Sequence, residues 1–239
     1  MSNEVYESAE QARRATDEFY CDRGFDYTPE QVRQWLSIYL RRPLKTGKVL
    51  DLCCGDGIWA RGIKDLSPDV TLYGIDISTG GIEKARTLLP DDAEGFVIGD
   101  AEHELPWAEG TFDLVFARGP GLYNQHSMDR LATIQVIEMW HRLLNRSGLF
   151  VSVFYSNPEL FGTYTNPLKV ALPYNRAPRL TETVDFTGGK FHHDTNSFLT
   201  PFRKARSVQL VDYRFIRNHH ILETRLDRGD QQGSAERAE

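Results

Sequence analysis

The sequence has few cysteines, no long apolar run and no excess of positive charge. Three cysteines in 239 residues, two of them adjacent, do not form a disulfide framework. No stretch approaches the roughly 18 apolar residues that a membrane-spanning helix needs. The first ten residues are polar and acidic, which is not the pattern of a secretory signal. We therefore expect a soluble, cytoplasmic protein that does not associate with membranes.

Acidic residues also outnumber basic residues. The formal net charge is −6 and the isoelectric point is about 5.7. A binder of duplex nucleic acid usually presents a basic surface, so no nucleic-acid partner is expected, although a net charge does not exclude a local basic patch. The length and composition predict one α/β domain over residues 1–228, followed by a polar, disordered tail over residues 229–239.

Two helices are expected before the main domain core, within residues 9–42. The first covers residues 9–20. The second follows Thr28, a good N-cap, with Pro29 in the first helical position and Gln31 completing a capping box. Pro43 is expected to stop this helix.

Strands and helices then alternate, which predicts a parallel sheet covered on both faces. The expected strands are residues 49–52, 70–75, 96–98, 112–117 and 149–155. The expected helices are residues 58–65, residues 81–89, and a third that Ser127 caps and that ends near Gly148.

After residue 156 the alternation breaks. An insertion over residues 157–196 is rich in proline, glycine and aromatic residues, and contains an expected hairpin of residues 181–186 and 190–193. A helix over residues 197–206 follows, with Pro201 placed in its first turn because proline is tolerated there. Two alternating strands, residues 208–215 and 220–226, close the domain.

A glycine-rich turn carries the clearest functional signal. Gly55-x-Gly57-x-x-Ala60 follows a strand and opens a helix, and Asp76 ends the next strand about 20 residues later. This pattern is typical of nucleotide-binding folds. Asp51 and Asp56 flank the turn, and carboxylates would repel the pyrophosphate of NAD. S-adenosylmethionine carries a sulfonium and an ammonium instead, so an acidic turn favours it.

The stretch from Val49 to Gly57 resembles motif I of the class I S-adenosylmethionine-dependent methyltransferases, with Cys53 at the first glycine position and Trp59 at the third. The segments 73–78, 99–102, 105–107 and 110–115 resemble the following motifs. The resemblance implies a doubly wound, Rossmann-like seven-stranded sheet, mostly parallel with an antiparallel last strand, and a lid-like insertion after the fifth strand. It also implies S-adenosylmethionine as cofactor.

The same resemblance implies roles for residues at the strand ends. Asp51 and Gly55 border the methionine moiety, and Asp76 holds the ribose. Arg118 lies near the methionine carboxylate or the acceptor. The implied cofactor-binding residues are Asp51, Cys53, Gly55, Asp76, Ile77, Asp100, Ala101 and Arg118.

The acceptor is expected between the loop 119–126 and the insertion 157–196, at the free part of the same sheet edge. His126 is the candidate general base, against the alternative of a capping or surface histidine. Tyr123, Tyr164 and His192 are the candidate substrate contacts. No metal site is expected, because adjacent residues of the His192-His193-Asp194 run point to opposite faces of a strand.

Three functions stay open at this point. Methyl transfer to a small-molecule oxygen, nitrogen or carbon nucleophile is favoured. The glycine pattern also permits an NAD(P)-dependent oxidoreductase. A methyltransferase of RNA or protein, or a binder of S-adenosylmethionine without catalytic activity, is the third possibility. The motifs of nucleic-acid amino methyltransferases and the paired glutamates of protein arginine methyltransferases are absent after the fourth strand.

Overall fold

A seven-stranded sheet forms the centre of the computed structural model, which describes residues 9–22, 27–103, 105–123, 128–156, 183–186 and 190–227. The strand order is β3-β2-β1-β4-β5-β9-β8. Only the β5–β9 and β8–β9 pairs of this sheet are antiparallel, so β9, the last strand in the chain, runs against the others. The expected Rossmann-like sheet is thereby confirmed. The strands are β1 (Thr46–Leu52), β2 (Asp69–Asp76), β3 (Phe96–Ile98), β4 (Phe112–Arg118), β5 (Leu144–Tyr155), β8 (Val208–Ile216) and β9 (His219–Leu226).

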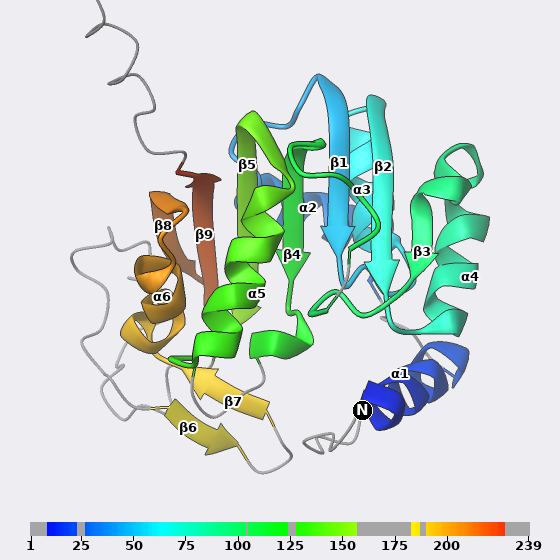
Figure 1. Ribbon diagram of the computed structural model, residues 1–239. Coiled ribbons are helices and arrows are strands. Elements are labelled where there is room, and N and C mark those ends of the chain that lie inside the picture. The colour runs from blue at the N-terminus through cyan, green and yellow to red at the C-terminus, as the bar shows by residue number, and fades with distance from the viewer. Residues whose placement is uncertain are drawn as a thin grey trace, which may run out of the picture.

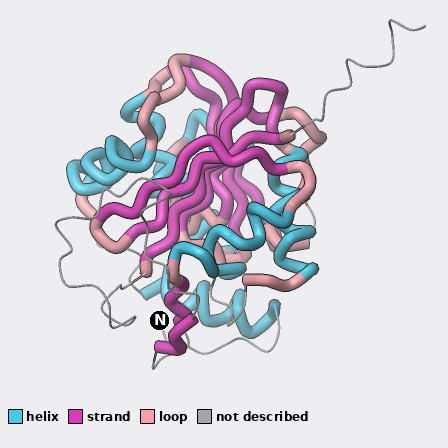
Figure 2. The backbone as a smooth tube through the Cα atoms, turned by 90° about the vertical axis from the view of Figure 1, so that its left-hand side faces the viewer, coloured by secondary structure: helices cyan, strands magenta, loops and turns pink. Residues whose placement is uncertain are grey.

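Helices cover both faces of this sheet (Figures 1 and 2). Helices α2, α3 and α4 pack on one face, and α5 and α6 on the other. Helix α1 and a separate hairpin of β6 and β7 lie at the end of the sheet to which the arrowheads of β1 and β2 point (Figure 1). The helices are α1 (Ala9–Asp22), α2 (Pro29–Tyr39), α3 (Ile58–Leu66), α4 (Thr79–Leu88), α5 (Leu131–Arg142) and α6 (Thr195–Lys204). The short elements are the 3₁₀ turns η1 (Pro90–Gly95) and η2 (Gly121–Tyr123) and the strands β6 (Thr183–Phe186) and β7 (Lys190–His193).

Helix α2 begins as its sequence predicts. The Thr28 side chain accepts a hydrogen bond from the Gln31 amide, and the Gln31 side chain accepts one from the Thr28 amide. These reciprocal bonds satisfy two amide groups that the first helical turn leaves open. Val32 and Leu36 then fall on the buried face, so α2 is fixed against the sheet.

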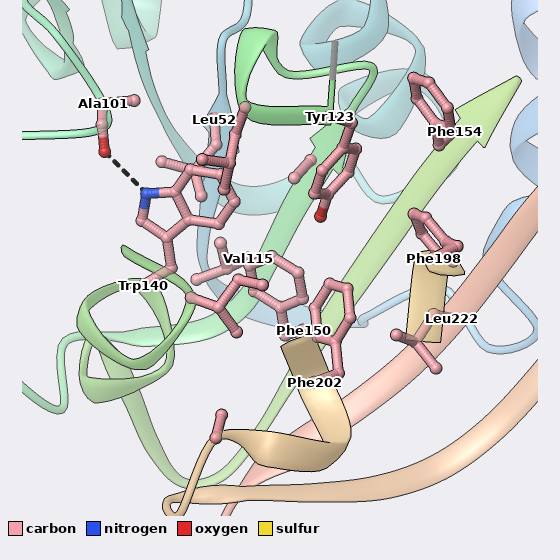
Figure 3. Packing of buried hydrophobic residues seen from close by; sticks show 14 of the residues in the cluster. Leu52, Ala101, Val115, Tyr123, Trp140, Phe150, Phe154, Phe198, Phe202 and Leu222 are labelled. Atoms are coloured by element: carbon pink, nitrogen blue, oxygen red, sulfur yellow. Dashed lines mark hydrogen bonds between the residues drawn. The ribbon is translucent and has the colours of Figure 1, made fainter. Parts of the chain in front are cut away.

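The core on the α5–α6 side is rich in aromatic residues (Figure 3). Trp140 is fully buried, and its indole Nε1 donates a hydrogen bond of 2.7 Å to the carbonyl oxygen of Ala101. Because Ala101 follows β3 and Trp140 lies in α5, this bond fixes the loop after β3 against the core. The core therefore helps to position one edge of the candidate site.

The boundary between α5 and β5 differs from the expectation. Arg130 is the N-cap of α5, whereas Ser127 lies outside the described residues, and the helix ends at Arg142 rather than near Gly148. The chain joins the sheet at Leu144, which pairs with Phe112, and the register then shifts so that Leu149 pairs with Leu114. Residues 145–148 form the resulting bulge, which a periodicity argument cannot distinguish from the end of a helix.

Pro201 lies in the interior of α6, so its expected place in the first turn was wrong. The helix starts earlier because the Asp194 side chain accepts a hydrogen bond of 2.7 Å from the Ser197 amide. Proline there lacks one backbone donor. The apolar face of α6, with Phe198 and Phe202 fully buried, holds the helix in place despite that loss.

Candidate functional site

The glycine turn joins the end of β1 to the start of α3. Gly55 and Gly57 adopt φ angles of 55° and 78°, and Cys53 adopts 58°. This left-handed region favours glycine and costs other residues roughly 1–2 kcal/mol. The geometry explains why glycine is usual at the first motif position, and Cys53 occupies it under strain.

Asp76 holds the glycine turn from the neighbouring strand. One carboxylate oxygen accepts a hydrogen bond of 2.8 Å from the Gly55 amide, and the other accepts one of 2.9 Å from the Ser78 amide. Asp76 is 6% exposed, and burial raises the pKa of its carboxyl despite these two donors. Each carboxylate oxygen keeps a second acceptor position, so the group can still receive ligand hydroxyls.

Asp51 lies at the end of β1, on the side of the sheet that faces α2 and α3. It is 2% exposed, and its Oδ2 has no hydrogen-bond partner among the residues that the structure describes. Burial raises the pKa of this carboxyl well above its usual value, and the charge of Asp76 adds to the effect. Arg118 at the end of β4 and the amide of Ala60 oppose it.

Arg118 is held between two aromatic rings. Its guanidinium carbon lies 4.2 Å from the ring centre of Trp59 and 5.4 Å from that of Tyr27, and Nη2 donates a hydrogen bond of 3.1 Å to the Tyr27 hydroxyl. Trp59 therefore does not disrupt the start of α3. It replaces the third glycine of the motif with a platform for a cation.

Four polar atoms in this cluster are buried without a hydrogen-bond partner among the described residues: Asp51 Oδ2, Trp59 Nε1, Arg118 Nε and the hydroxyl of Tyr39, whose ring lies beside that of Trp59. Buried polar groups in proteins are nearly always paired, so such atoms indicate that something else completes the site. The first is an acceptor, the next two are donors, and the hydroxyl can act as either. Sequence reasoning missed Trp59 and Tyr27, although the departure of Trp59 from the glycine motif was a visible signal.

The turn after β3 supplies the next candidate residues. Asp100 Oδ1 accepts from the Glu102 amide at 2.9 Å, and Oδ2 lies 2.9 Å from His103 Nδ1. Asp100 is therefore fixed by its own turn. Ile77 is half-buried between Asp76 and Ser78 at the end of β2. The structure thus brings the strand-end residues of β1, β2, β3 and β4 to one edge of the sheet.

The expected acceptor residues are not gathered in this way. Tyr123 is fully buried in the core, and its hydroxyl lies 2.6 Å from Ser152 Oγ (Figure 3). Its ring meets Phe154 and Phe198, and its role as a substrate contact stays a prediction. His126 and Tyr164 lie outside the described residues, and of His192 only the backbone in β7 is described.

The end of the insertion is structural. His193 is buried, and its Nε2 donates a hydrogen bond of 2.9 Å to the carbonyl oxygen of Tyr123. Across the described residues, no group of three or more histidine, cysteine or acidic side chains is placed to hold a metal ion. Nor is any helix there long and apolar enough to cross a membrane.

Comparison with known proteins finds similarity to methyltransferases. Residues 49–148 match the family model described as a methyltransferase domain. A demethylmenaquinone methyltransferase of Lactococcus lactis is 34% identical over 116 residues, which are 47% of this chain and 43% of that protein. A ribosomal RNA small subunit methyltransferase C of Haemophilus influenzae is 32% identical over 131 residues, which are 52% of this chain and 38% of that protein.

Solved structures of methyltransferases resemble this fold. A DhpI–SAH complex superimposes with a TM-score of 0.60 at 14% identity, covering 92% of this chain and 98% of that one. At this identity the likeness shows the fold alone. The chain spans less than half of the length of the two curated relatives described above. Their activities are therefore properties of those proteins.

Proposed function

We propose that this chain, a member of the class I S-adenosylmethionine-dependent methyltransferase family, binds S-adenosylmethionine at the carboxyl ends of β1 to β4 and transfers its methyl group to a small-molecule acceptor. The proposal rests on one observation above all. The buried, unpartnered polar atoms around the ends of β1 and β4 and the start of α3 include a carboxylate acceptor, Asp51 Oδ2, and two donors, Trp59 Nε1 and Arg118 Nε. An amino-acid zwitterion is the ligand end that satisfies both kinds of group.

The acceptor and the donors of the cluster would each bind one charged group of that zwitterion. Asp51 would accept from the ammonium, and Arg118 with Trp59 would donate to the carboxylate. Burial strengthens such charged hydrogen bonds because little water competes for them. Cys53 and Gly55 would border the same moiety through the backbone of the turn. The residues present therefore fit the methionine part of the cofactor.

The nucleoside part would extend along the neighbouring strand ends. Asp76 would accept the ribose hydroxyls with the acceptor positions that Gly55 and Ser78 leave open. Asp100 would accept the adenine amino group, Ala101 would approach the ring through its backbone amide, and Ile77 would pack on the ring face.

The chemistry asks little of the protein beyond alignment. When bound, S-adenosylmethionine supplies a methyl group on a sulfonium, which an acceptor displaces in line. The protein holds both partners and excludes water. A hydroxyl acceptor would also need a base, and His126 remains the proposed base for that case.

A small acceptor is favoured over a macromolecule. The net charge of −6 does not suit a phosphate backbone, and Asp51, Asp56 and Asp76 make the glycine turn acidic. The Lactococcus relative is named for demethylmenaquinone, which is not a macromolecule. The Haemophilus relative is named for ribosomal RNA, so RNA is the alternative acceptor. We keep the acceptor position between the loop 119–126 and the insertion 157–196, with Tyr164 and His192 as proposed contacts.

Titration calorimetry tests the cofactor. The protein should bind S-adenosylmethionine and not NADH. Asp51→Asn should weaken binding, whereas Asp65→Asn, which changes a carboxylate at the far end of α3 that pairs with Arg61, should not. Binding of NADH without S-adenosylmethionine would instead identify an oxidoreductase.

The acceptor needs a separate screen. Release of S-adenosylhomocysteine is measured with fractions of a metabolite extract and, in parallel, with ribosomal RNA. We expect turnover with a metabolite fraction, and turnover with RNA alone would refute the small-molecule assignment. Replacing residues 158–189 by a short glycine-serine linker should abolish turnover and spare cofactor binding. This deletion stops before His193 and Asp194, which the fold needs.

A further inference from the structure

Helix α1 is fixed to the N-terminus of α4 by one carboxylate. Asp17 Oδ1 accepts a hydrogen bond of 2.7 Å from the Ser78 hydroxyl and one of 3.1 Å from the Gly80 amide. Ser78 is itself the N-cap of α4 and accepts from the Gly81 amide at 2.9 Å. A negative charge is favourable at a helix N-terminus. Asp17 therefore joins α1 to α4, two helices that are far apart in the sequence and that Figure 1 shows next to each other.

The same helix places Tyr20 on the glycine turn. Tyr20 is 6% exposed, and its hydroxyl faces the open side of Gly55, so that a methyl group added to Gly55 would overlap it. Burial and the charges of Asp76 and Asp56 all raise the pKa of this phenol, which stays neutral. The Tyr20 carbonyl also accepts a hydrogen bond from Lys84 of α4.

Most of the α1 side chains that the structure describes lie outside the buried core. Among the α1 side chains that the structure describes, only Tyr20 is buried, whereas Arg13, Arg14 and Glu18 are exposed. Elements with few buried contacts open at low free-energy cost, and lids belong to this class. With one buried side chain among those described, and that side chain over the glycine turn, α1 meets this description.

We propose that α1 is a lid over the cofactor, that Tyr20 is its contact with the ligand, and that Asp17 is the latch that fastens it to α4. The proposal rests on the cofactor site proposed above, since Gly55 and Asp76 belong to that site. Because Tyr20 lies against the glycine turn, cofactor that enters or leaves must displace α1. Breaking the Asp17 hydrogen bonds then controls how fast S-adenosylhomocysteine leaves and S-adenosylmethionine enters.

The rate of cofactor release tests the latch. Dissociation of S-adenosylhomocysteine is followed by stopped-flow tryptophan fluorescence, with Trp59 in the site as reporter. Loss of two charged hydrogen bonds in Asp17→Ala should accelerate dissociation by roughly ten- to hundredfold. Tyr20→Ala should accelerate it as well. Glu18→Gln is the matched control on the same helix, because its partner is the exposed Arg14, and it should leave the rate unchanged.

Hydrogen exchange separates a lid from a merely structural helix. S-adenosylhomocysteine should slow amide exchange in α1 of the unaltered protein and should do so less in Asp17→Ala. Unchanged dissociation rates in both variants, together with amide exchange in α1 that does not depend on the ligand, would refute the lid proposal. The proposed cofactor site would not be affected by that result. Tighter binding by Asp17→Ala would show that Tyr20 occupies the ligand position, which also refutes the proposal. If the unaltered protein fails to bind the ligand, the proposed function fails first.

Discussion

Replacing Arg118 by methionine should remove one end of the cofactor site without collapsing it. The guanidinium lies 4.2 Å above the ring centre of Trp59 and has its Nε buried without a partner. Methionine keeps a polarisable chain of similar length over the ring, so the aromatic packing of Trp59 and Tyr27 should persist. The variant loses the charge and the donors that we assign to the methionine carboxylate.

The expected size of the effect follows from those contacts. A hydrogen bond to a charged group contributes about 1.5–3 kcal/mol, which corresponds to roughly a ten- to hundredfold weaker Kd for S-adenosylhomocysteine. Asp51 adds a second consequence. Arg118 opposes the rise of the Asp51 pKa, so the variant should raise that pKa further and weaken ammonium binding at low pH.

A pair of ligands isolates the role of Arg118. Methylthioadenosine has the same nucleoside as S-adenosylhomocysteine but no amino-acid end. Calorimetry should therefore show weaker binding of S-adenosylhomocysteine to Arg118→Met and unchanged binding of methylthioadenosine. Arg61→Met is the control, since Arg61 pairs with Asp65 at the surface of α3. Equal weakening of both ligands would mean that Arg118 supports the fold and not the carboxylate.

Further predictions address the other strand ends and the core. Asp76→Ala should weaken cofactor binding by about 1–3 kcal/mol through lost charged hydrogen bonds, and an unchanged Kd would remove Asp76 from the site. Asp100→Asn should discriminate less between S-adenosylmethionine and its inosine analogue, which competition binding measures. Burial lowers the pKa of His141 from 6.5 to about 4, so its neutral form contributes stability that is complete above pH 6.5 and is lost as the pH falls toward 4. Urea unfolding should show a loss of about 3 kcal/mol over that interval, and His141→Gln should reduce it.

Much of the fold was predictable because local patterns and global packing agree. The capping box placed the start of α2, and the positions of the sheet strands followed from buried apolar runs. The failures occurred where tertiary contacts override a local rule. The register shift that begins at Leu144 replaces the expected end of a helix, and the cap at Asp194 moves Pro201 into a helix interior.

The site was predictable to the extent that its motifs lie at strand ends. Asp51, Asp76 and Arg118 reach one edge because parallel strands end together. The acceptor side depends on long-range packing, and Tyr123 shows the consequence. Nothing in its local sequence distinguishes a ring that faces the acceptor from one that meets Ser152 in the core.

Trp59 is where a departure from the motif carries information. A glycine at this position would leave the Arg118 guanidinium without its platform, and the arginine would lose a preferred orientation. With Trp59 present, the cation is stacked near Asp51, yet within the described part of the chain neither Asp51 Oδ2 nor the indole Nε1 has a hydrogen-bond partner. Ionised groups buried with open hydrogen-bond positions are costly unless a ligand completes them. Trp59 packs in the core, but packing alone does not require its indole N–H, so the buried donor supports the proposal that this position helps to recognise a zwitterion.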